Sequence, residues 1–179
     1  MFNQITLEHC PGLTNLLGDG ERIEDLMKLS PEAILLRWVN YQLERAGTNR
    51  RCNNFTNDIN DSEVYSYLLN QIAPNDAGVT LEALRENNPL TRAEIMLQQA
   101  NKLGCRSFVT PEDVVNGIYK LNLAFVANLF NNHPALNADT AIEVYWNGLN
   151  LETFLLNNYL NVDLGIGPDW RNSRRKDLP

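Results

Sequence analysis

The stretch at residues 26–47, LMKLSPEAILLRWVNYQLERAG, restricts the possible fold more than any other part of the chain. Its serine can cap a helix through the hydroxyl, and the following proline suits the first helical position, where its missing N–H costs nothing. Apolar residues then recur every three or four positions, and a glycine follows as a natural stop. The pattern predicts an amphipathic helix with one face in a core, formed by Leu35, Trp38, Val39 and Leu43.

The chain after this helix predicts a loop and then a second helix. Residues 48–61, TNRRCNNFTNDIND, are rich in Asn and Asp, whose side chains bond to nearby backbone and favour turns. Val64, Leu68 and Ile72 then lie on one stripe of a helix that ends before Pro74. The region that follows is punctuated by Asn, Gly and Pro, so we expect at most a turn or two of helix in VTLEALRE.

Two further helix starts are visible in the second half of the chain. Thr91 and Glu94 have the spacing of a capping box, and the helix that they open is expected to stop at Gly104. The sequence TPED at residues 110–113 has the same character and predicts a short helix through Val115. Both starts are followed by apolar residues, so both helices are expected to pack against the core.

The segment KLNLAFVANLFNNHPAL at residues 120–136 predicts a central helix. Its apolar residues surround the helix axis instead of forming a stripe, which indicates burial on most sides, and Pro134 ends it. Together these patterns give four main helices with short connecting helices and no persuasive strand pattern. We therefore predict an all-α fold.

Three of these strings resemble the second calponin-homology domain of the fimbrin/plastin family, whose members cross-link actin filaments. They are the stretch at residues 26–47, RAEIMLQQANKLGCRSFVTPEDVV, and KLNLAFVANLFNNHPAL. The resemblance implies a calponin-homology fold over residues 26–136, preceded by a connector segment in residues 1–25. The alternative interpretation of residues 1–25 is an N-terminal helix that packs on the same domain, and the two interpretations are compatible. Residues 137–179 show no match and form a C-terminal extension, in which Tyr145, Leu149, Phe154, Leu155 and Tyr159 favour an amphipathic helix or two.

Charge and composition exclude several classes of partner. The net charge of −7 produces a field that repels nucleic acid and anionic lipid, so we expect neither partner. Apolar runs fall short of the ~20 residues of a membrane span, and MFNQITLEHC lacks the order of a signal peptide, which predicts a cytoplasmic protein. The three cysteines lie far apart, so neither a disulfide framework nor a zinc site is expected.

The inventory of reactive side chains argues against an enzyme. His9 and His133 are the two histidines of the chain, and neither sits in a nucleophile, metal or acid–base motif. Asp58, Asp61 and Glu63 cluster where a helix is expected to begin, which negative charge favours for the helix's own stability. The sequence therefore predicts no catalytic residues, no metal and no cofactor.

The best candidate surface is the side of the first main helix opposite its core face, together with the loop beyond it. Residues 31–51 hold four arginines against two glutamates, a local charge of +2 in an acidic protein. A charged helix face is also commonly just solvated, and that alternative stays open. The candidate residues are Arg37, Tyr41, Glu44, Arg45, Arg50 and Arg51.

The family resemblance gives this surface a possible role. It implies a secondary contact to F-actin and packing against a first calponin-homology domain in a parent protein of the actin cytoskeleton. Cross-linking requires two actin-binding units, so one such domain bundles filaments only through its parent or by self-association. The alternative is a calponin-homology domain that binds or regulates other proteins without touching actin.

Overall fold

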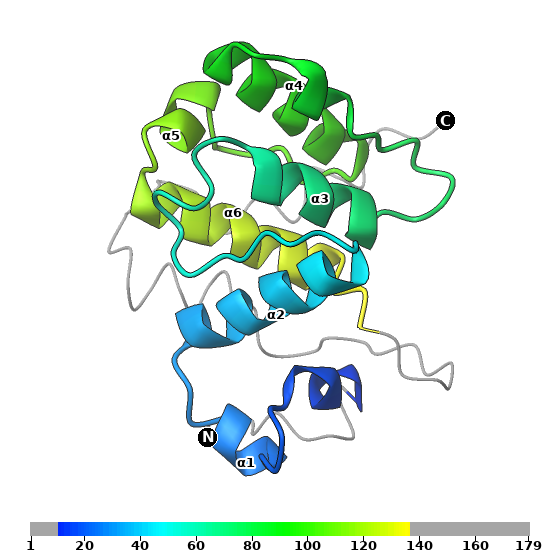
Figure 1. Cartoon of the computed structure of the whole chain (residues 1–179), viewed down its shortest axis with the longest axis vertical. Coiled ribbons are helices and arrows are strands. Elements are labelled where there is room, and N and C mark those ends of the chain that lie inside the picture. Colours follow the sequence, from blue (N-terminus) through cyan, green and yellow to red (C-terminus); the bar gives the residue numbers. More distant parts are fainter. Residues whose placement is uncertain (1–10, 137–179) are drawn as a thin grey trace, which may run out of the picture.

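The computed structural model describes residues 11–136, and all regular structure in this part is helical, as predicted. Helices α3 and α6 lie between α4 at the top and α2, with η1 and α1 below α2 (Figure 1). The helix expected in the C-terminal extension lies outside the described residues. The elements are η1 Pro11–Leu16, α1 Ile23–Leu26, α2 Pro31–Arg45, α3 Glu63–Ile72, η2 Glu82–Arg85, α4 Pro89–Lys102, α5 Pro111–Val115 and α6 Tyr119–Asn132.

Helix α2 forms as its sequence predicts. The Ser30 hydroxyl oxygen accepts a hydrogen bond from the Ala33 amide at 3.2 Å, and Pro31 occupies the first helical position. The predicted core face, Leu35, Trp38, Val39 and Leu43, is fully buried. Glu44 and Arg45 at the end of α2 are exposed.

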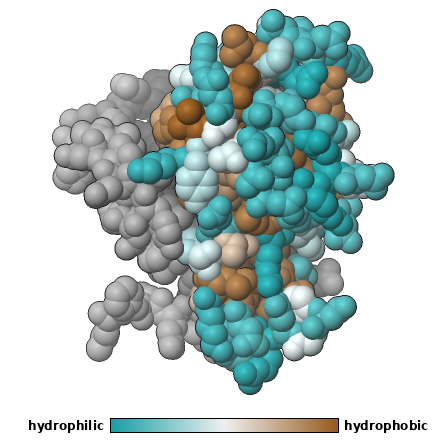
Figure 2. All heavy atoms as spheres, turned by 60° about the vertical axis from the view of Figure 1, so that its left-hand side comes forward, coloured by the Kyte–Doolittle hydropathy of each residue, from teal (hydrophilic) through white to brown (hydrophobic). Residues whose placement is uncertain are grey.

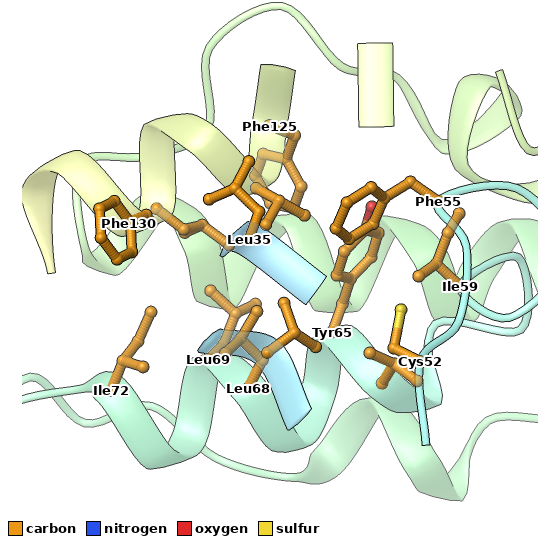
Figure 3. Packing of buried hydrophobic residues seen from close by; sticks show 14 of the residues in the cluster. Leu35, Cys52, Phe55, Ile59, Tyr65, Leu68, Leu69, Ile72, Phe125 and Phe130 are labelled. Carbon is orange, nitrogen blue, oxygen red and sulfur yellow. The ribbon is translucent and has the colours of Figure 1, made fainter. Parts of the chain in front are cut away.

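Helix α6 runs through the centre of the bundle, and its residues from Asn122 to Phe130 are all buried. Figure 3 shows Phe125 and Phe130 facing the side chains that α3 presents to the core. The rings of Tyr65 and Phe125 meet edge to face at 5.2 Å, and the Tyr65 hydroxyl donates to Asn122 Oδ1 at 2.9 Å. The prediction of burial on most sides is confirmed.

Helix α4 begins three residues before the expected position. The cap is Asn88, whose Oδ1 accepts a hydrogen bond from the Thr91 amide at 3.0 Å, and Pro89 is the first helical residue. The predicted capping box of Thr91 and Glu94 is wrong because an Asn-Pro pair stands just upstream and provides both the cap and a preset first φ. The Glu94 carboxylate instead accepts two hydrogen bonds from Arg106, both at 2.7 Å.

The loop between α2 and α3 is ordered by asparagine side chains. Asn40 donates to the Cys52 carbonyl at 2.7 Å and accepts from the Cys52 amide at 2.9 Å, which ties the loop to α2. Asn54 Oδ1 accepts from three successive backbone amides further along. The loop also buries Phe55 and Ile59 completely, which its turn-rich composition did not predict.

Residues 11–26 pack against the bundle, and we call them the leading segment. Leu13 and Leu16 of η1 are 4% and 5% exposed, and Leu26 at the end of α1 is fully buried. The described part of the predicted connector is therefore also part of the domain's packing, an arrangement compatible with both interpretations of the sequence. Most of the face seen in Figure 2 is hydrophilic, with small separate apolar areas.

Candidate partner-binding surface

The six predicted residues fall into two groups with different surroundings. Arg37 and Arg50 make close ion pairs with carboxylates of other segments. The other four lie on the last turns of α2 and at the start of the loop, and they are more exposed or make looser contacts. We call these four, Tyr41, Glu44, Arg45 and Arg51, the outer α2 surface.

Arg37 is directed at the leading segment. Both of its terminal nitrogens donate to the Glu21 carboxylate, Nη2 to Oε1 at 2.9 Å, and Nη1 also donates to the Leu16 carbonyl at 3.2 Å. The hydrogen bond from Arg37, followed by that from the Gly18 amide, lowers the pKa of Glu21 from 4.5 to about 2. Arg37 therefore acts first as an anchor for the leading segment.

Arg50 is held against the start of α3. Its Nη2 donates to Asp61 Oδ2 at 2.6 Å, and its Nε lies 3.5 Å from Glu63 Oε2. The side chains of Arg50, Asp61 and Glu63 are each about one-third exposed. Arg50 thus fastens the loop to α3, and its charge is matched locally.

The outer α2 surface combines an aromatic ring with two accessible cations. The guanidinium of Arg45 lies 5.5 Å from the centroid of the Tyr41 ring, within the range of a cation–π contact. Arg51 Nη2 lies 3.9 Å from Glu44 Oε2, and their side chains are 52% and 73% exposed. Such a loose, solvated pair contributes little to stability, so both groups remain accessible to a partner.

The charge of the wider region differs from the value counted along the sequence. Residues 31–51 carry +2, but Glu21, Asp61 and Glu63 from other segments pair with two of its arginines. Including these three carboxylates changes the local balance to −1. A partner therefore meets a mixed surface in which positive charge is concentrated at Arg45 and Arg51.

Sequence reasoning missed a set of hydrogen bonds on the same helix. Trp38 Nε1 donates to the Pro134 carbonyl at 2.7 Å, and Gln42 Nε2 donates to the carbonyls of Pro134 and Ala135, both at 3.1 Å. Arg45 Nη1 donates to the Ala135 carbonyl at 3.1 Å. The signal that could have revealed this is a glutamine one turn after Trp38, on a face that is otherwise apolar.

Those residues considered for chemistry that the structure describes have structural partners, whereas His9 lies outside the described residues. His133 Nε2 lies 2.9 Å from the Leu103 carbonyl, Asp58 accepts from the Asn53 amide at 2.7 Å, and Asp61 binds Arg50. Within residues 11–136 the structure brings together no group of three His, Cys, Asp or Glu side chains able to hold a metal ion. In the same part of the chain, every helix is too short or too polar to cross a membrane.

Comparison with known proteins gives a consistent result. Residues 29–135 match the calponin homology (CH) domain. The crystal structure of the actin-crosslinking core of Schizosaccharomyces pombe fimbrin resembles the chain with a TM-score of 0.61 and 48% identity, over 66% of this chain and 25% of that one. Fimbrin of Dictyostelium discoideum is 51% identical over 168 residues, and Plastin-3 of Homo sapiens is 49% identical over 178 residues.

The matches to the fimbrin and the plastin cover most of this chain but only a small part of each relative. Each covers 94% of this chain but only 27% and 28% of the fimbrin and the plastin, so the chain spans about a quarter of these relatives. Residues 1–136 make up less than 94% of the chain. Both matches therefore reach into residues 137–179, where inspection of the sequence found no resemblance.

Proposed function

Since the chain belongs to the calponin homology domain family, we propose that it is an F-actin-binding module that contributes a secondary filament contact. The observation that carries this proposal is the 48% identity to the actin-crosslinking core of fission yeast fimbrin, over 66% of the chain. The module acts by binding and not by catalysis. Its place is the cytoplasm, in the actin cytoskeleton.

The outer α2 surface is the proposed contact. Arg45 and Arg51 offer guanidinium groups that can pair with carboxylates on a filament, and Tyr41 offers an aromatic face beside Arg45. Glu44 holds Arg51 loosely. Replacing this ion pair by one between Arg51 and a carboxylate of the partner therefore costs little free energy. Arg37 and Arg50 support the surface indirectly, by fixing the leading segment and the loop on either side of it.

Filament cross-linking needs more than this module. A cross-link requires two actin-binding units, and this chain offers one calponin homology match, at residues 29–135. We propose that it serves as the second calponin-homology domain of a bundling protein and packs against a first one. Alone, it is expected to bind filaments weakly, because the accessible part of the contact is small.

Co-sedimentation with actin filaments tests the proposal. The double variant Arg45→Glu/Arg51→Glu is expected to lose pelleting relative to the wild-type chain. The matched control is Arg85→Glu/Lys120→Glu, which changes two exposed cations elsewhere by the same total charge and is expected to pellet like the wild type. Circular dichroism establishes that all three proteins are folded. Equal pelleting by the two double variants would contradict the proposed surface.

A second candidate function is a calponin-homology domain that binds or regulates other proteins without touching actin. The observation in its favour is the local balance of −1 once the ion pairs are included, which weakens the attraction to an acidic filament. A folded wild-type chain that fails to pellet with filaments, even at low salt, would favour this alternative.

A further inference from the structure

Neighbouring residues of α2 hold the two ends of the described domain. Arg37 binds the leading segment through Glu21 and Leu16. The next residue, Trp38, donates to the Pro134 carbonyl in residues 133–136, which we call the trailing segment. Figure 1 shows both segments reaching α2, from below and from the end of α6. One helix therefore fixes the direction of the chain on both sides of the bundle.

The trailing segment is held through its backbone. Three side chains of α2 make four hydrogen bonds to the two successive carbonyls of Pro134 and Ala135. Two of the donors, Trp38 and Gln42, are fully buried, so losing these bonds would leave polar groups without water to replace them. The third donor, Arg45, closes the set at the surface.

The trailing segment is also strained where it is held. Ala135 has a φ of +43°, a left-handed conformation that is unfavourable for a residue with a Cβ. Such a conformation persists only where surrounding contacts enforce it, and the hydrogen bonds from α2 are those contacts. If they weaken, the strain at Ala135 favours release of the segment.

The two segments also touch each other. A Cβ at position 12 would lie 2.6 Å from the Cβ and from the carbonyl oxygen of Leu136, so the absence of a side chain at Gly12 is what permits this approach. Gly12 is buried, and Leu136 is half-buried. Removing the leading segment would thus withdraw one wall of the site that encloses the trailing segment.

We propose that the leading and trailing segments form one coupled latch on α2, so that loosening the first releases the second while the helical bundle stays folded. The Arg37–Glu21 pair closes one side, the carbonyl bonds from Trp38, Gln42 and Arg45 close the other, and the Gly12–Leu136 contact joins them. Through the latch, a conformational change in the chain that precedes the bundle alters how the trailing segment leads into residues 137–179. Arg45 belongs both to the latch and to the outer α2 surface, whereas Arg37, Trp38 and Gln42 belong to the latch alone.

The indole N–H of Trp38 reports the state of the latch, because it donates directly to the trailing segment. Its hydrogen exchange is measured by NMR in the full chain, with Trp146→Phe and Trp170→Phe variants to assign the indole signals. Glu21→Ala is expected to speed exchange at Trp38 by about fivefold or more. The matched control Glu24→Ala removes a carboxylate of the same segment that is 62% exposed and lies 4.0 Å from Arg22 Nε, and it is expected to leave the rate unchanged.

Gly12→Ala provides a second variant that keeps the ion pair intact. The added methyl group is directed at Leu136, so exchange at Trp38 is expected to rise again, while backbone amides of α6 keep wild-type protection. Coupling would be overturned if Glu21→Ala loosened the amide of Leu17 without changing exchange at Trp38. The proposal would equally be overturned if the backbone amides of the leading segment kept wild-type protection from exchange in Glu21→Ala. It would also be overturned if the amides of α6 exchanged as fast as the Trp38 indole N–H, because the whole bundle would then be opening.

Discussion

The guanidinium of Arg37 and the carboxylate of Glu21 form a two-pronged ion pair that fastens the leading segment to α2. Helix periodicity placed Arg37 on the face opposite the core, where it was predicted to meet a partner. In the structure that position is covered by residues from before the helix. Charge reversal at Arg37 would therefore disturb the leading segment as well as any binding surface, so the filament test leaves Arg37 unchanged. Arg45 donates to the Ala135 carbonyl, so protection of the Trp38 indole N–H from exchange is the control that the Arg45→Glu/Arg51→Glu variant still holds the trailing segment.

The Arg37–Glu21 pair predicts a specific pH dependence. Because the folded-state pKa of Glu21 is about 2, below its ordinary value of 4.5, the pair stabilises the folded chain above about pH 4.5. This contribution is lost as the pH falls through about 2. The melting temperature of the wild type should therefore exceed that of Glu21→Gln at about pH 5 and converge with it near pH 2.

Comparing the wild type with Glu21→Gln separates the contribution of Glu21 to the pH dependence from that of the other carboxylates. Glu94 also has a lowered pKa, because of its hydrogen bonds from Arg106, but it is present in both proteins and its effect cancels in the difference. A difference in melting temperature that stays constant between about pH 5 and pH 2 would contradict the assignment.

Trp38 is predicted to be essential for stability. Trp38→Ala removes a fully buried ring that meets Phe130 edge to face at 5.2 Å, and it removes a hydrogen bond to Pro134. We expect a loss of about 3–5 kcal/mol in the free energy of unfolding, measured by urea denaturation. Leu90→Ala is the control, because that side chain is 44% exposed and its truncation should cost less than about 0.5 kcal/mol.

The fold could be predicted largely from the sequence, because its signals are local. The Ser30-Pro31 cap, the spacing of the apolar residues in α2 and the all-round apolar pattern of α6 each depend on residues within a few positions. The predicted start of α4 is three residues late because two cap signals overlap, and Asn88-Pro89 prevails over Thr91. Boundaries of this kind depend on which of two adjacent caps the chain adopts.

The candidate surface could be predicted only in part, because its electrostatics are not local. Periodicity identified which side chains of α2 leave the core, but not that Glu21 and Asp61 would neutralise Arg37 and Arg50. The carbonyl contacts of Gln42 join residues more than 90 positions apart. Such contacts follow from the tertiary arrangement, and the only local sign was a buried polar residue.

The strained conformation of Ala135 leads to a test by substitution. Ala135→Gly relieves the strain of a φ of +43° in the folded chain, but it also raises the entropy of the unfolded chain. We therefore expect the free energy of unfolding to stay the same or to rise by up to about 1 kcal/mol. Ala33→Gly within α2 should instead lose about 0.5–1 kcal/mol. Denaturant unfolding of both variants compares them directly, and equal losses would mean that position 135 is unstrained.

The two described cysteines are predicted to be unreactive in the folded chain. Cys52 is 1% exposed and Cys105 fully buried, and burial, followed by the nearby Asp58, raises the pKa of the Cys52 thiol to about 12. After treatment with iodoacetamide near pH 8, mass spectrometry should find both residues unmodified in the native protein and modified in denaturant. Rapid native labelling of Cys52 would contradict its described packing.

The most direct test of the account is the salt dependence of filament affinity, measured by co-sedimentation over a series of filament concentrations. If Arg45 and Arg51 provide the contact, the dissociation constant of the wild-type chain should rise clearly between ~50 and ~200 mM salt. The folded Arg45→Glu/Arg51→Glu variant should bind more weakly at every salt concentration, with a smaller dependence on it. Wild-type and variant chains with the same affinity and the same salt dependence would contradict the claim that this surface binds actin.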